Sequence, residues 1–504
     1  MQADNSPNKW LALVGLSLLS FTAFLDYTIV ATALPFIQKD LNATVLQLQW
    51  VMNIYGMILC MFMIAAGQAG DLFGRKTIYF TGFILFGIAA LGAGGASSIE
   101  WLISFRAIQG FAAAIIFTVG VALLPQAFPA QEQTRAIGIF SAFNGAGLAV
   151  GPFLGGLLIT FLSWRWVFWI NIPLIVFGLL LCMPHLKPSP RPDYKIKIDW
   201  LGLLLLIVGL GSLVYGIIFG EQTGWDHSLT WTFIGTGVVA LLLLIAVENR
   251  VAQPLLDFSL FRNSHATLAM LVCSAAGFIT FVFMFFDPLY LEIIRKQGAF
   301  MVGIILLSVP AIQVIISLLF EKLVKKTGVF NLILYALLAA LLAAICHVLF
   351  TSSINMLFVI FALMLMGYTW GIANVGSISA IAQSVKPEKL GGAIGTVFTF
   401  WNISGSIFLA LTSVIFHWRE SDALFTGLAK ANVAMTPEQQ QQIQGLISDP
   451  QHAQVVITQY FSGKAGDIYQ LFESSFMAGF HAVAWFAIVI MVIIFLAGLA
   501  LSKK

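Results

Sequence analysis

Long apolar stretches separated by short polar segments make up most of this chain. Windows of about 20 apolar residues, the length that crosses a bilayer as a helix, fall near 11–35, 47–67, 77–98, 101–124, 136–161, 166–184, 200–219, 230–248, 266–290, 300–320, 330–351, 355–382, 392–416 and 478–501. In lipid, unpaired backbone groups are so costly that only helices and closed barrels span it. The pattern therefore predicts an all-α polytopic membrane protein with about fourteen transmembrane helices.

The composition agrees with that prediction. Of 504 residues, 60% are hydrophobic and only 9% are charged, a balance typical of membrane proteins and not of soluble ones. The four cysteines stand singly in apolar windows with no paired spacing, so the sequence predicts neither a disulfide framework nor a metal site.

Basic residues predict the orientation. An even number of spans places both termini on one side of the membrane, and short cytoplasmic segments are enriched in Lys and Arg. If the termini lie inside, the inner segments hold Lys9, Arg75, Lys76, Arg135, Lys187, Arg191, Lys195, Lys197, Arg250, Arg262, Lys322, Lys325, Lys326, Lys386, Lys389, Lys503 and Lys504. The outer segments hold far fewer: Lys39, Arg165, Arg295, Lys296, Arg419, Lys430 and Lys464. We therefore expect both termini in the cytoplasm and the chain in a bacterial cytoplasmic (inner) membrane.

Two similar short basic segments in corresponding positions predict how the spans are grouped. GDLFGRK (Gly70 to Lys76) follows the second window, and EKLVKKTG (Glu321 to Gly328) follows the second window of the last six. Such correspondence indicates a duplicated transporter with an inserted central pair of helices. We expect a six-helix bundle in 1–184, a cytoplasmic linker with two additional helices in 185–265, and a second six-helix bundle in 266–504. The second bundle includes a long outer loop, 418–477, in which a short helix is predicted to begin at Thr436.

Glycines dominate the window that begins near Ala136. Each glycine costs up to ~1 kcal/mol in a helix relative to alanine, and an interior proline about 3 kcal/mol. In lipid the helix persists, so glycines at this spacing predict a face that another helix can approach closely, with a bend at the proline. The residues are Gly138, Gly147, Gly151, Pro152, Gly155 and Gly156.

Two charges are predicted deep inside spans. A carboxylate such as Asp26 costs at least ~2.5–3.5 kcal/mol at a bilayer centre and is a functional candidate for that reason. At 1.5 Å per residue, Asp26 lies roughly 24 Å from the inner face and Arg106 roughly 22 Å from it. Opposite charges at one depth can pair. One interpretation is that Asp26 carries the coupled proton, because desolvation raises the pKa of a carboxyl group and a nearby cation lowers it. The alternative is a static structural ion pair.

The segment GQAGDLFGRK joins the second and third windows. Gly67, Gly70 and Gly74 permit a tight turn, Asp71 can receive a helix N-terminus or a cation, and Arg75 with Lys76 stays at the cytoplasmic surface. We interpret these six residues as a cytoplasmic gate that latches two bundles. A positive-inside anchor alone is the competing interpretation.

Other residues are candidates for a substrate cavity or its vestibule: Trp50, Tyr55, Asn144, Asp287, Glu292 and Trp401. Asp287 falls near the outer end of its window, as a solvated loop acid or as part of a vestibule that attracts cations. Trp401 is expected to pack against lipid, with cavity lining as the alternative. His347 and His481 are isolated among apolar residues, which favours structural roles over proton relay.

Several motifs, taken in order, resemble the 14-span drug:proton antiporter branch of the major facilitator superfamily. They are LDYTIVATALP from Leu25, LQWVMNIYGM from Leu48, GQAGDLFGRK, RAIQG, the glycine pattern of 138–156, SWRWVFWINIP from Ser163, DWLG from Asp199 and PLLDFSLFRN from Pro254. The resemblance implies the major facilitator fold and proton-coupled export by rocking of two bundles around a midplane cavity. It implies proton coupling by Asp26 and Arg106. Asp287, Glu292 and Trp401 depart from the family pattern.

The leading hypothesis is a multidrug antiporter that exports small amphiphilic compounds, cations among them, in exchange for protons. A dedicated exporter of one metabolite, such as a siderophore, and a transport-dead sensor on the same fold are the alternatives. No ATP-binding loop motif or catalytic constellation occurs in the sequence, so we expect no enzyme activity and no cofactor beyond the proton gradient. The expected partners are the substrate, protons and the bilayer, with no nucleic acid. We expect a functional monomer, to which a periplasmic adaptor is a conceivable addition.

Overall fold

The computed structural model describes residues 9–186, 199–225, 227–251, 260, 262–385, 390–430 and 465–502. All regular structure in these ranges is helical. Thirteen of the helices are long and apolar enough to cross a membrane. The predicted window 166–184 contains a shorter apolar helical segment, Trp166–Cys182, which consists of α6 (Trp166–Trp169) and α7 (Asn171–Cys182). The predicted all-α polytopic fold is therefore confirmed.

The helices follow the chain as an up-and-down series. The first half contains α1 (Lys9–Leu41), α2 (Val45–Phe73), α3 (Arg75–Gly94), α4 (Ile99–Ala127), α5 (Ala130–Phe161), α6 and α7. The central pair is α8 (Trp200–Thr223) and α9 (Ser228–Glu248). The second half contains α10 (Ser264–Leu289), the π-helix η2 (Tyr290–Ile294), α11 (Ala299–Leu306), α12 (Ser308–Thr327), α13 (Val329–Val348), α14 (Met356–Ser384), α15 (Leu390–Lys430) and α18 (Ala465–Ser502).

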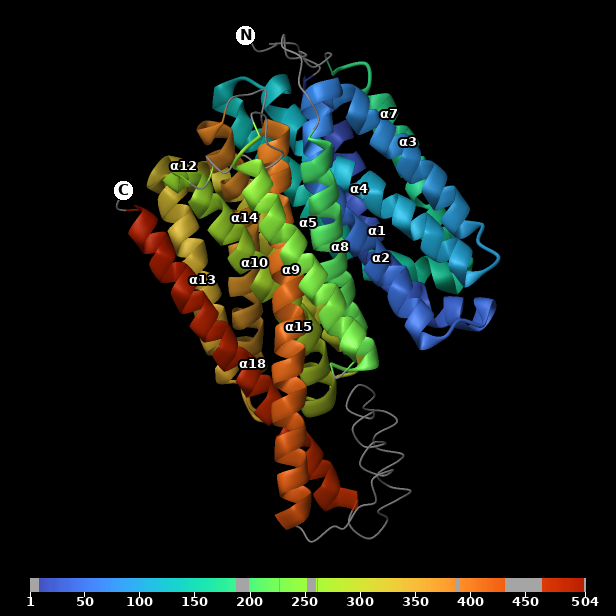
Figure 1. Cartoon of the computed structure of the whole chain (residues 1–504), viewed down its shortest axis with the longest axis vertical. Helices are drawn as coiled ribbons and strands as arrows, with labels where there is room; N and C mark the ends of the chain where they lie inside the picture. Colours follow the sequence, from blue (N-terminus) through green and yellow to red (C-terminus); the bar gives the residue numbers. More distant parts are fainter. Residues whose placement is uncertain are drawn as a thin grey trace.

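Figure 1 shows the two halves side by side, with α1–α7 in blue to teal and α10–α18 in yellow to red. The green pair α8 and α9 packs along the front, where α8 contacts both α2 and α15. The start of α1 and the end of α18 lie at the same end of the molecule, the upper end in Figure 1. We call this end the termini side and the opposite end the distal side.

The two halves contact each other chiefly through α2 with α15 and through α5 with α12. Gln313 of α12 donates an amide hydrogen bond to the Ser141 carbonyl of α5 at 3.0 Å. A Cβ at Gly138 of α5 would overlap the Ser317 carbonyl of α12. These α5 residues belong to the half of the helix nearer the termini side, so the halves are pressed together there.

The glycines of α5 serve two different neighbours, which corrects the prediction of one close-packing face. Gly147, Gly151 and Gly155 lie against α1, where a Cβ would overlap main-chain or threonine atoms. Gly138 instead lies against α12, in the other half. Gly156 faces open space, because nothing lies within 4 Å of its Cβ position.

Pro152 lies within α5 and provides an additional link to α1. A proline has no N–H, so the carbonyl four residues earlier loses its helical partner. That carbonyl is Leu148 O, and it accepts a hydrogen bond from the Thr28 hydroxyl of α1 at 3.2 Å. The Thr28 hydroxyl thus replaces the backbone hydrogen bond that Pro152 removes.

The outer loop predicted for 418–477 is shorter in the structure, because helices extend into it from both ends. Helix α15 continues to Lys430 and α18 begins at Ala465, so only the part between them falls outside the described residues, along with the helix predicted to begin at Thr436. At 1.5 Å per residue, the 41 residues of α15 are about twice as long as a hydrocarbon core is thick. Both helices extend past the others at the distal side (Figure 1), and the buried Leu424, Leu428, Phe472 and Phe476 explain why the helical structure persists.

Two glycines of the motif provide a matched test of this packing. In Gly147→Ala the new methyl group would lie 2.6 Å from the Phe21 carbonyl oxygen of α1. Overpacking of this kind costs about 1–3 kcal/mol, so the melting temperature in detergent is expected to fall by several degrees. Gly156→Ala is the control, and it should leave the melting temperature unchanged or slightly higher. Equal shifts for the two variants would contradict the assignment of Gly147 to the α1–α5 contact.

Candidate functional site

A fully buried carboxylate lies between α1, α4 and α7. Asp26 Oδ2 accepts a hydrogen bond from the Arg106 guanidinium at 2.6 Å. Its other oxygen accepts from the Asn171 amide at 2.8 Å and from the Gln109 amide at 3.3 Å. All four side chains are almost completely excluded from solvent. The two charges that were predicted at one depth are therefore paired, and the carboxylate is satisfied on both oxygens.

Arg106 is held on its other sides by α2. Its Nε donates to the Val51 carbonyl at 3.1 Å, and its guanidinium carbon lies 4.3 Å from the centre of the Tyr55 ring. The Tyr55 ring in turn packs edge-on against Tyr27, with ring centres 5.9 Å apart. Removing one member of a buried pair typically costs about 3–5 kcal/mol, because the remaining charge has no partner. The position of Arg106 is thus sensitive to the charge on Asp26.

Sequence reasoning did not identify Gln109 and Asn171. Gln109 lies three residues after Arg106, one helical turn along the same face of α4, and this spacing was a usable signal. Asn171 begins α7 after the break that ends α6, and no spacing in the sequence relates it to Asp26.

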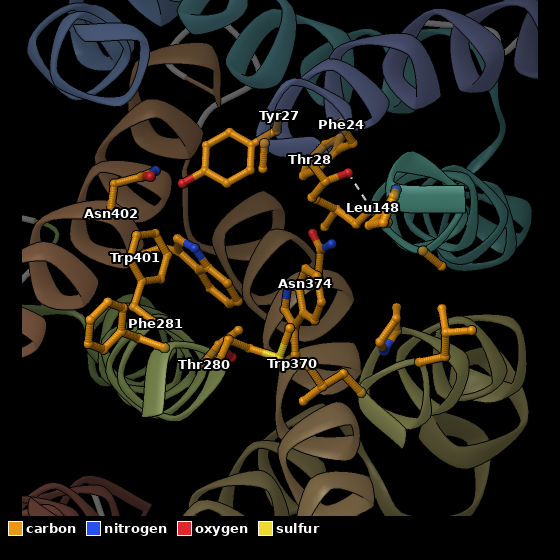
Figure 2. A pocket seen from close by; sticks show the side chains of 18 of the residues that line it. Phe24, Tyr27, Thr28, Leu148, Thr280, Phe281, Trp370, Asn374, Trp401 and Asn402 are labelled. Carbon is orange, nitrogen blue, oxygen red and sulfur yellow. Dashed lines mark hydrogen bonds between the residues drawn. The ribbon is translucent and has the colours of Figure 1, made fainter. Parts of the chain in front are cut away.

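A cavity of about 900 Å³ lies between the two halves, close to this network. Its wall is formed by α1, α2, α4 and α5 from the first half and by α10, α11, α12, α14 and α15 from the second. Phe24, Tyr27, Thr28 and Ala31 line it at helical spacing, whereas Asp26 points to another face of α1. Figure 2 shows aromatic rings and a few amides and hydroxyls around the space. Among the described residues that line this cavity there is no Asp, Glu, Lys, Arg or His.

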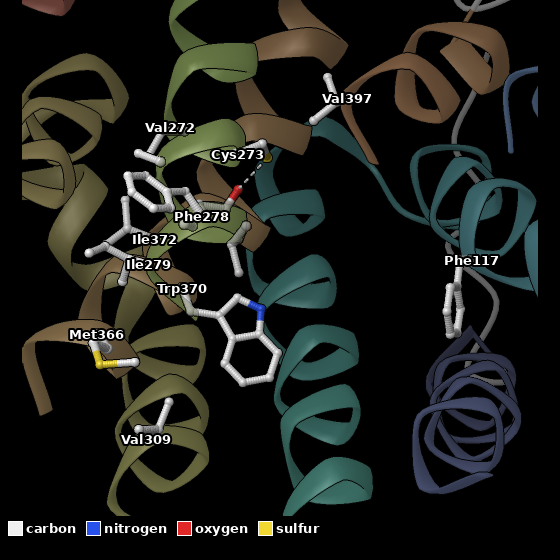
Figure 3. Close-up of a cluster of buried hydrophobic side chains, with 14 of the residues drawn as sticks. Phe117, Val272, Cys273, Phe278, Ile279, Val309, Met366, Trp370, Ile372 and Val397 are labelled. Carbon is white, nitrogen blue, oxygen red and sulfur yellow. Dashed lines mark hydrogen bonds between the residues drawn. The ribbon is translucent and has the colours of Figure 1, made fainter. Parts of the chain in front are cut away.

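The aromatic wall continues into the core of the second half. Figure 3 shows Phe278, Ile279, Met366 and Ile372 packed together, with the Trp370 indole extending from this cluster towards the first half. The neighbouring Cys273 donates to the Ala373 carbonyl at 3.7 Å. Trp370 therefore has one side in a packed core and another at the cavity.

The structure corrects several predictions about the cavity. Trp401 lines it, so the expectation that this side chain packs against lipid is wrong. The other five candidates do not line it. Trp50 stacks on Tyr215 of α8 with ring centres 5.4 Å apart, Tyr55 contacts Arg106, Asn144 is buried within α5, and Glu292 is exposed in η2. Spacing alone does not tell which face of a helix meets the cavity.

Asp287, the remaining candidate, is neither a loop acid nor part of a vestibule. It is fully buried, and its Oδ2 lies 3.2 Å from His347 Nε2, so His347 is not isolated. His347 Nδ1 lies 2.7 Å from the Ala343 carbonyl and therefore carries a hydrogen. His481 contacts the Phe350 carbonyl at 2.8 Å, in keeping with a structural role. Among the described residues no group of three or more His, Cys, Asp or Glu could hold a metal.

The candidate gate joins α2 to the start of α15 on the termini side. Asp71 accepts hydrogen bonds from Arg75 at 2.7 and 2.8 Å and from the backbone N–H groups of Gly391 and Gly392 at 3.1 and 2.9 Å. The carboxylate thus occupies the N-terminus of α15, where the helix dipole favours negative charge. Of the two partners anticipated for Asp71, a helix N-terminus and a cation, the structure contains both.

The glycines of the gate permit this close approach. A Cβ at Gly67 would overlap the Gly391 carbonyl, and one at Gly70 would lie 2.9 Å from Val119 of α4. Gly74 has φ +97°, a backbone conformation that side chains disfavour. The Lys76 ammonium donates to the Met183 and Leu186 carbonyls within the first half. Gly391 and Gly392 were not predicted.

Comparison with known proteins places this architecture in a family. The sequence profile described as "Major Facilitator Superfamily" matches residues 16–409. The chain is 31% identical over 410 residues to the "Multidrug resistance protein Stp" of Mycobacterium tuberculosis, covering 81% of this chain and 76% of that one. It is 30% identical over 417 residues to the "Puromycin resistance protein pur8" of Streptomyces alboniger, covering 81% and 82%. It is 28% identical over 409 residues to the "Riboflavin transporter RibZ" of Clostridioides difficile, covering 81% and 88%.

Solved structures agree on the fold. The human organic anion transporter MFSD10 aligns with a TM-score of 0.58 at 11% identity, over 95% of this chain and all of that one. A bacterial homologue of the lysosomal transporter Spinster aligns with a TM-score of 0.57 at 16% identity, over 99% of each. This chain belongs to the major facilitator superfamily. It is therefore an integral membrane transporter of small molecules, related to drug-resistance exporters, and not an enzyme.

The gate geometry predicts the effect of removing the Asp71 carboxylate. In Asp71→Ala the N-terminus of α15 loses its cap and Arg75 its anion, so the termini side should open more often. A cysteine introduced at Ser317, which is buried between α12 and α5, reports this opening. Its reaction with a polar maleimide in detergent should accelerate at least fivefold, after subtraction of the labelling of the four native cysteines in the same protein without Ser317→Cys.

Glu321→Ala is the control for that experiment, because Glu321 pairs with the exposed Lys325 on its own helix. It should leave the labelling rate unchanged. If the cysteine of Ser317→Cys reacts equally slowly alone and in combination with Asp71→Ala, the contact between α2 and α15 does not hold the termini side closed.

Proposed function

We propose that this transporter is a proton-coupled antiporter that exports small amphiphilic compounds by alternating access. The observation that carries the proposal is the buried Asp26–Arg106 pair on α1 and α4, directly behind a cavity that α1 also lines. Asp26 is the group that would bind and release the coupled proton, and Arg106 is the group that would respond to it.

The physical basis of coupling is the cost of a buried charge without a partner. When Asp26 binds a proton, Arg106 retains the Val51 carbonyl and the Gln109 side chain but loses its anion. An unpaired buried charge costs about 3–5 kcal/mol. Converting a population of two conformations from 1:99 to 99:1 takes about 5.5 kcal/mol. One protonation event therefore supplies most of the free energy that a conformational switch of this kind requires.

Helix α1 is the element through which the proton would act on the substrate. One face of α1 carries Asp26, and another contributes Phe24, Tyr27 and Thr28 to the cavity wall. The Thr28 hydroxyl is bonded to α5 beside Pro152. If α1 shifts when protonation of Asp26 breaks the ion pair with Arg106, the cavity wall and the α1–α5 contact would therefore change together.

We further propose that the termini side faces the cytoplasm of a bacterial cell, because most Lys and Arg residues lie in the segments assigned to that side. In this proposal the Asp71 latch closes the cytoplasmic entrance, and the substrate leaves the cavity towards the outside. Opening that latch while the distal ends approach would expose the cavity to the cytoplasm, as rocking of two bundles requires.

The relatives support export of more than one type of compound, because two of them are named for multidrug and puromycin resistance. A dedicated transporter of one metabolite is the second candidate, and the relative named as a riboflavin transporter favours it. A transport-dead sensor would be expected to lose the coupling residues, and Asp26 with its partners is intact here.

Transport driven by an imposed pH gradient tests the proposal. Inverted vesicles that contain the protein should accumulate dyes from an amphiphilic panel when their lumen is acidic. Asp26→Asn keeps the size of the side chain but removes its charge, and it should reduce gradient-driven uptake at least tenfold. Asp40→Asn is the control, since Asp40 lies on the same helix in a partly exposed pair with Arg165. Uptake that ignores the gradient, or an unimpaired Asp26→Asn variant, would contradict the coupling assignment.

A further inference from the structure

The wall of the cavity differs in its two halves, and the second half contains a distinct set of groups. Trp370 and Asn374 of α14, Trp401 of α15 and Thr280 of α10 surround one part of the space (Figure 2). We propose that these four residues form a subsite for uncharged, planar aromatic molecules that carry a hydrogen-bonding group on the ring edge. This proposal rests on the proposed transport function and specifies its substrate class.

The absence of charge from the wall argues against permanent cations as the preferred substrates. None of the described lining residues is an Asp or Glu, and the neighbouring carboxylate of Asp26 is already paired with Arg106. Removing an ion from water costs several kcal/mol even after the protein relaxes. Contact with aromatic faces returns only about 0.5–2 kcal/mol. An uncharged molecule does not have this desolvation cost, so the cavity wall favours uncharged substrates over cations. The substrate class is therefore narrower than the amphiphilic compounds and cations expected from the sequence.

The two tryptophans provide flat surfaces for a ring. Their ring centres lie 5.7 Å apart at an interplanar angle of 37°, close enough for both to contact one bound molecule. The main chain of Trp401 packs against α10, because Gly277 lies so close to the Trp401 carbonyl that a Cβ there would overlap it. Trp370 is held by the packed core shown in Figure 3. Rigid aromatic walls favour planar partners, since little side-chain freedom is lost on binding.

Two polar groups beside these rings have no protein partner. Asn374 Oδ1 and Thr280 Oγ1 make no hydrogen bond, although the two residues are only 4% and 8% exposed. They lie on either side of the Trp370 indole in Figure 2. By contrast, the Thr28 hydroxyl is bonded to Leu148 O, and the Asn402 amide is bonded to Phe398 O.

An unmet polar group inside a protein is costly unless a partner arrives. Asn374 and Thr280 both line the cavity, so rotation of either side chain would turn its unpaired oxygen towards a molecule bound there. An amide or hydroxyl on the edge of an aromatic ring can both donate and accept, so it matches the Asn374 amide and the Thr280 hydroxyl beside the two indole rings. A ring lacking such a group would stack but leave the polar atoms unmet, and it should bind more weakly.

Three tricyclic probes of nearly equal size separate these contributions. Phenanthridinone carries an edge amide, phenanthridine has a single ring nitrogen, and N-methylphenanthridinium is a permanent cation. Binding to the full-length purified protein in detergent is measured from the fluorescence of each probe. Phenanthridinone should bind at least tenfold more tightly than the cation, with phenanthridine between them.

Substitutions at one position then test the role assigned to it. Asn374→Leu should weaken phenanthridinone binding about five- to thirtyfold, the effect expected when one hydrogen bond is lost, and should leave the cation unaffected. Asn374→Asp introduces a carboxylate of the same shape and should improve binding of the cation at least tenfold. Ser379→Ala is the matched control. Ser379 lies on the same helix with a buried hydroxyl that also lacks a partner, but it does not line the cavity.

The subsite is refuted if the cation binds as tightly as phenanthridinone to the unsubstituted protein. It is also refuted if Asn374→Leu, with a melting temperature like that of Ser379→Ala, binds phenanthridinone as tightly as the unsubstituted protein does, or if Asn374→Asp binds the cation no more tightly. These readouts are independent of the pH gradient. Selective binding of phenanthridinone without proton-driven uptake would contradict the proposed antiport but support the subsite. Proton-driven uptake with preferred binding of the cation would contradict the subsite alone.

Discussion

A carboxylate and a guanidinium, buried together with no access to water, are the constraint on which the rest of this structure depends. Asp26 and Arg106 can share a low-dielectric interior only because each neutralises the other and amide groups satisfy the remaining sites. The helices that supply these groups, α1, α4 and α7, must therefore stay in register. A change in the charge of either side chain alters the free energy of the whole arrangement, and this makes the pair suitable for coupling.

The close packing of α1 connects the ion pair to the remainder of the molecule. Glycines of α5 bring that helix into contact with α1, and Pro152 leaves a carbonyl that Thr28 binds. On the termini side, Gly67 and Gly391 allow the two halves to meet at Asp71. The small residues thus create surfaces that fit closely in the observed state, and such contacts can separate without breaking covalent or helical structure.

Much of this arrangement could be predicted from the sequence, because hydropathy, depth and glycine spacing are local properties. The fold class, the pairing of Asp26 with Arg106 and the capping role of Asp71 all follow from them. What could not be predicted depends on helix rotation and on distant partners. The buried position of Asp287 beside His347 and the cavity position of Trp401 require knowing which face of a helix meets which neighbour. The long α15–α18 pair was missed because hydropathy marks the bilayer, whereas helices continue past it when their apolar faces pack together.

In the proposed mechanism, proton coupling and substrate recognition occupy separate places: the Asp26–Arg106 pair is buried on one face of α1, and the described residues that line the cavity on another face carry no charge. The most direct test of this separation is the number of protons exchanged when a transported compound binds to the purified protein in weakly buffered detergent solution. The account predicts that binding changes the number of bound protons by about one per molecule, and that Asp26→Asn binds the same compound with no proton exchange. If Asp26→Asn exchanged as many protons on binding as the unsubstituted protein, the carboxylate at the centre of this account would not be the group that couples.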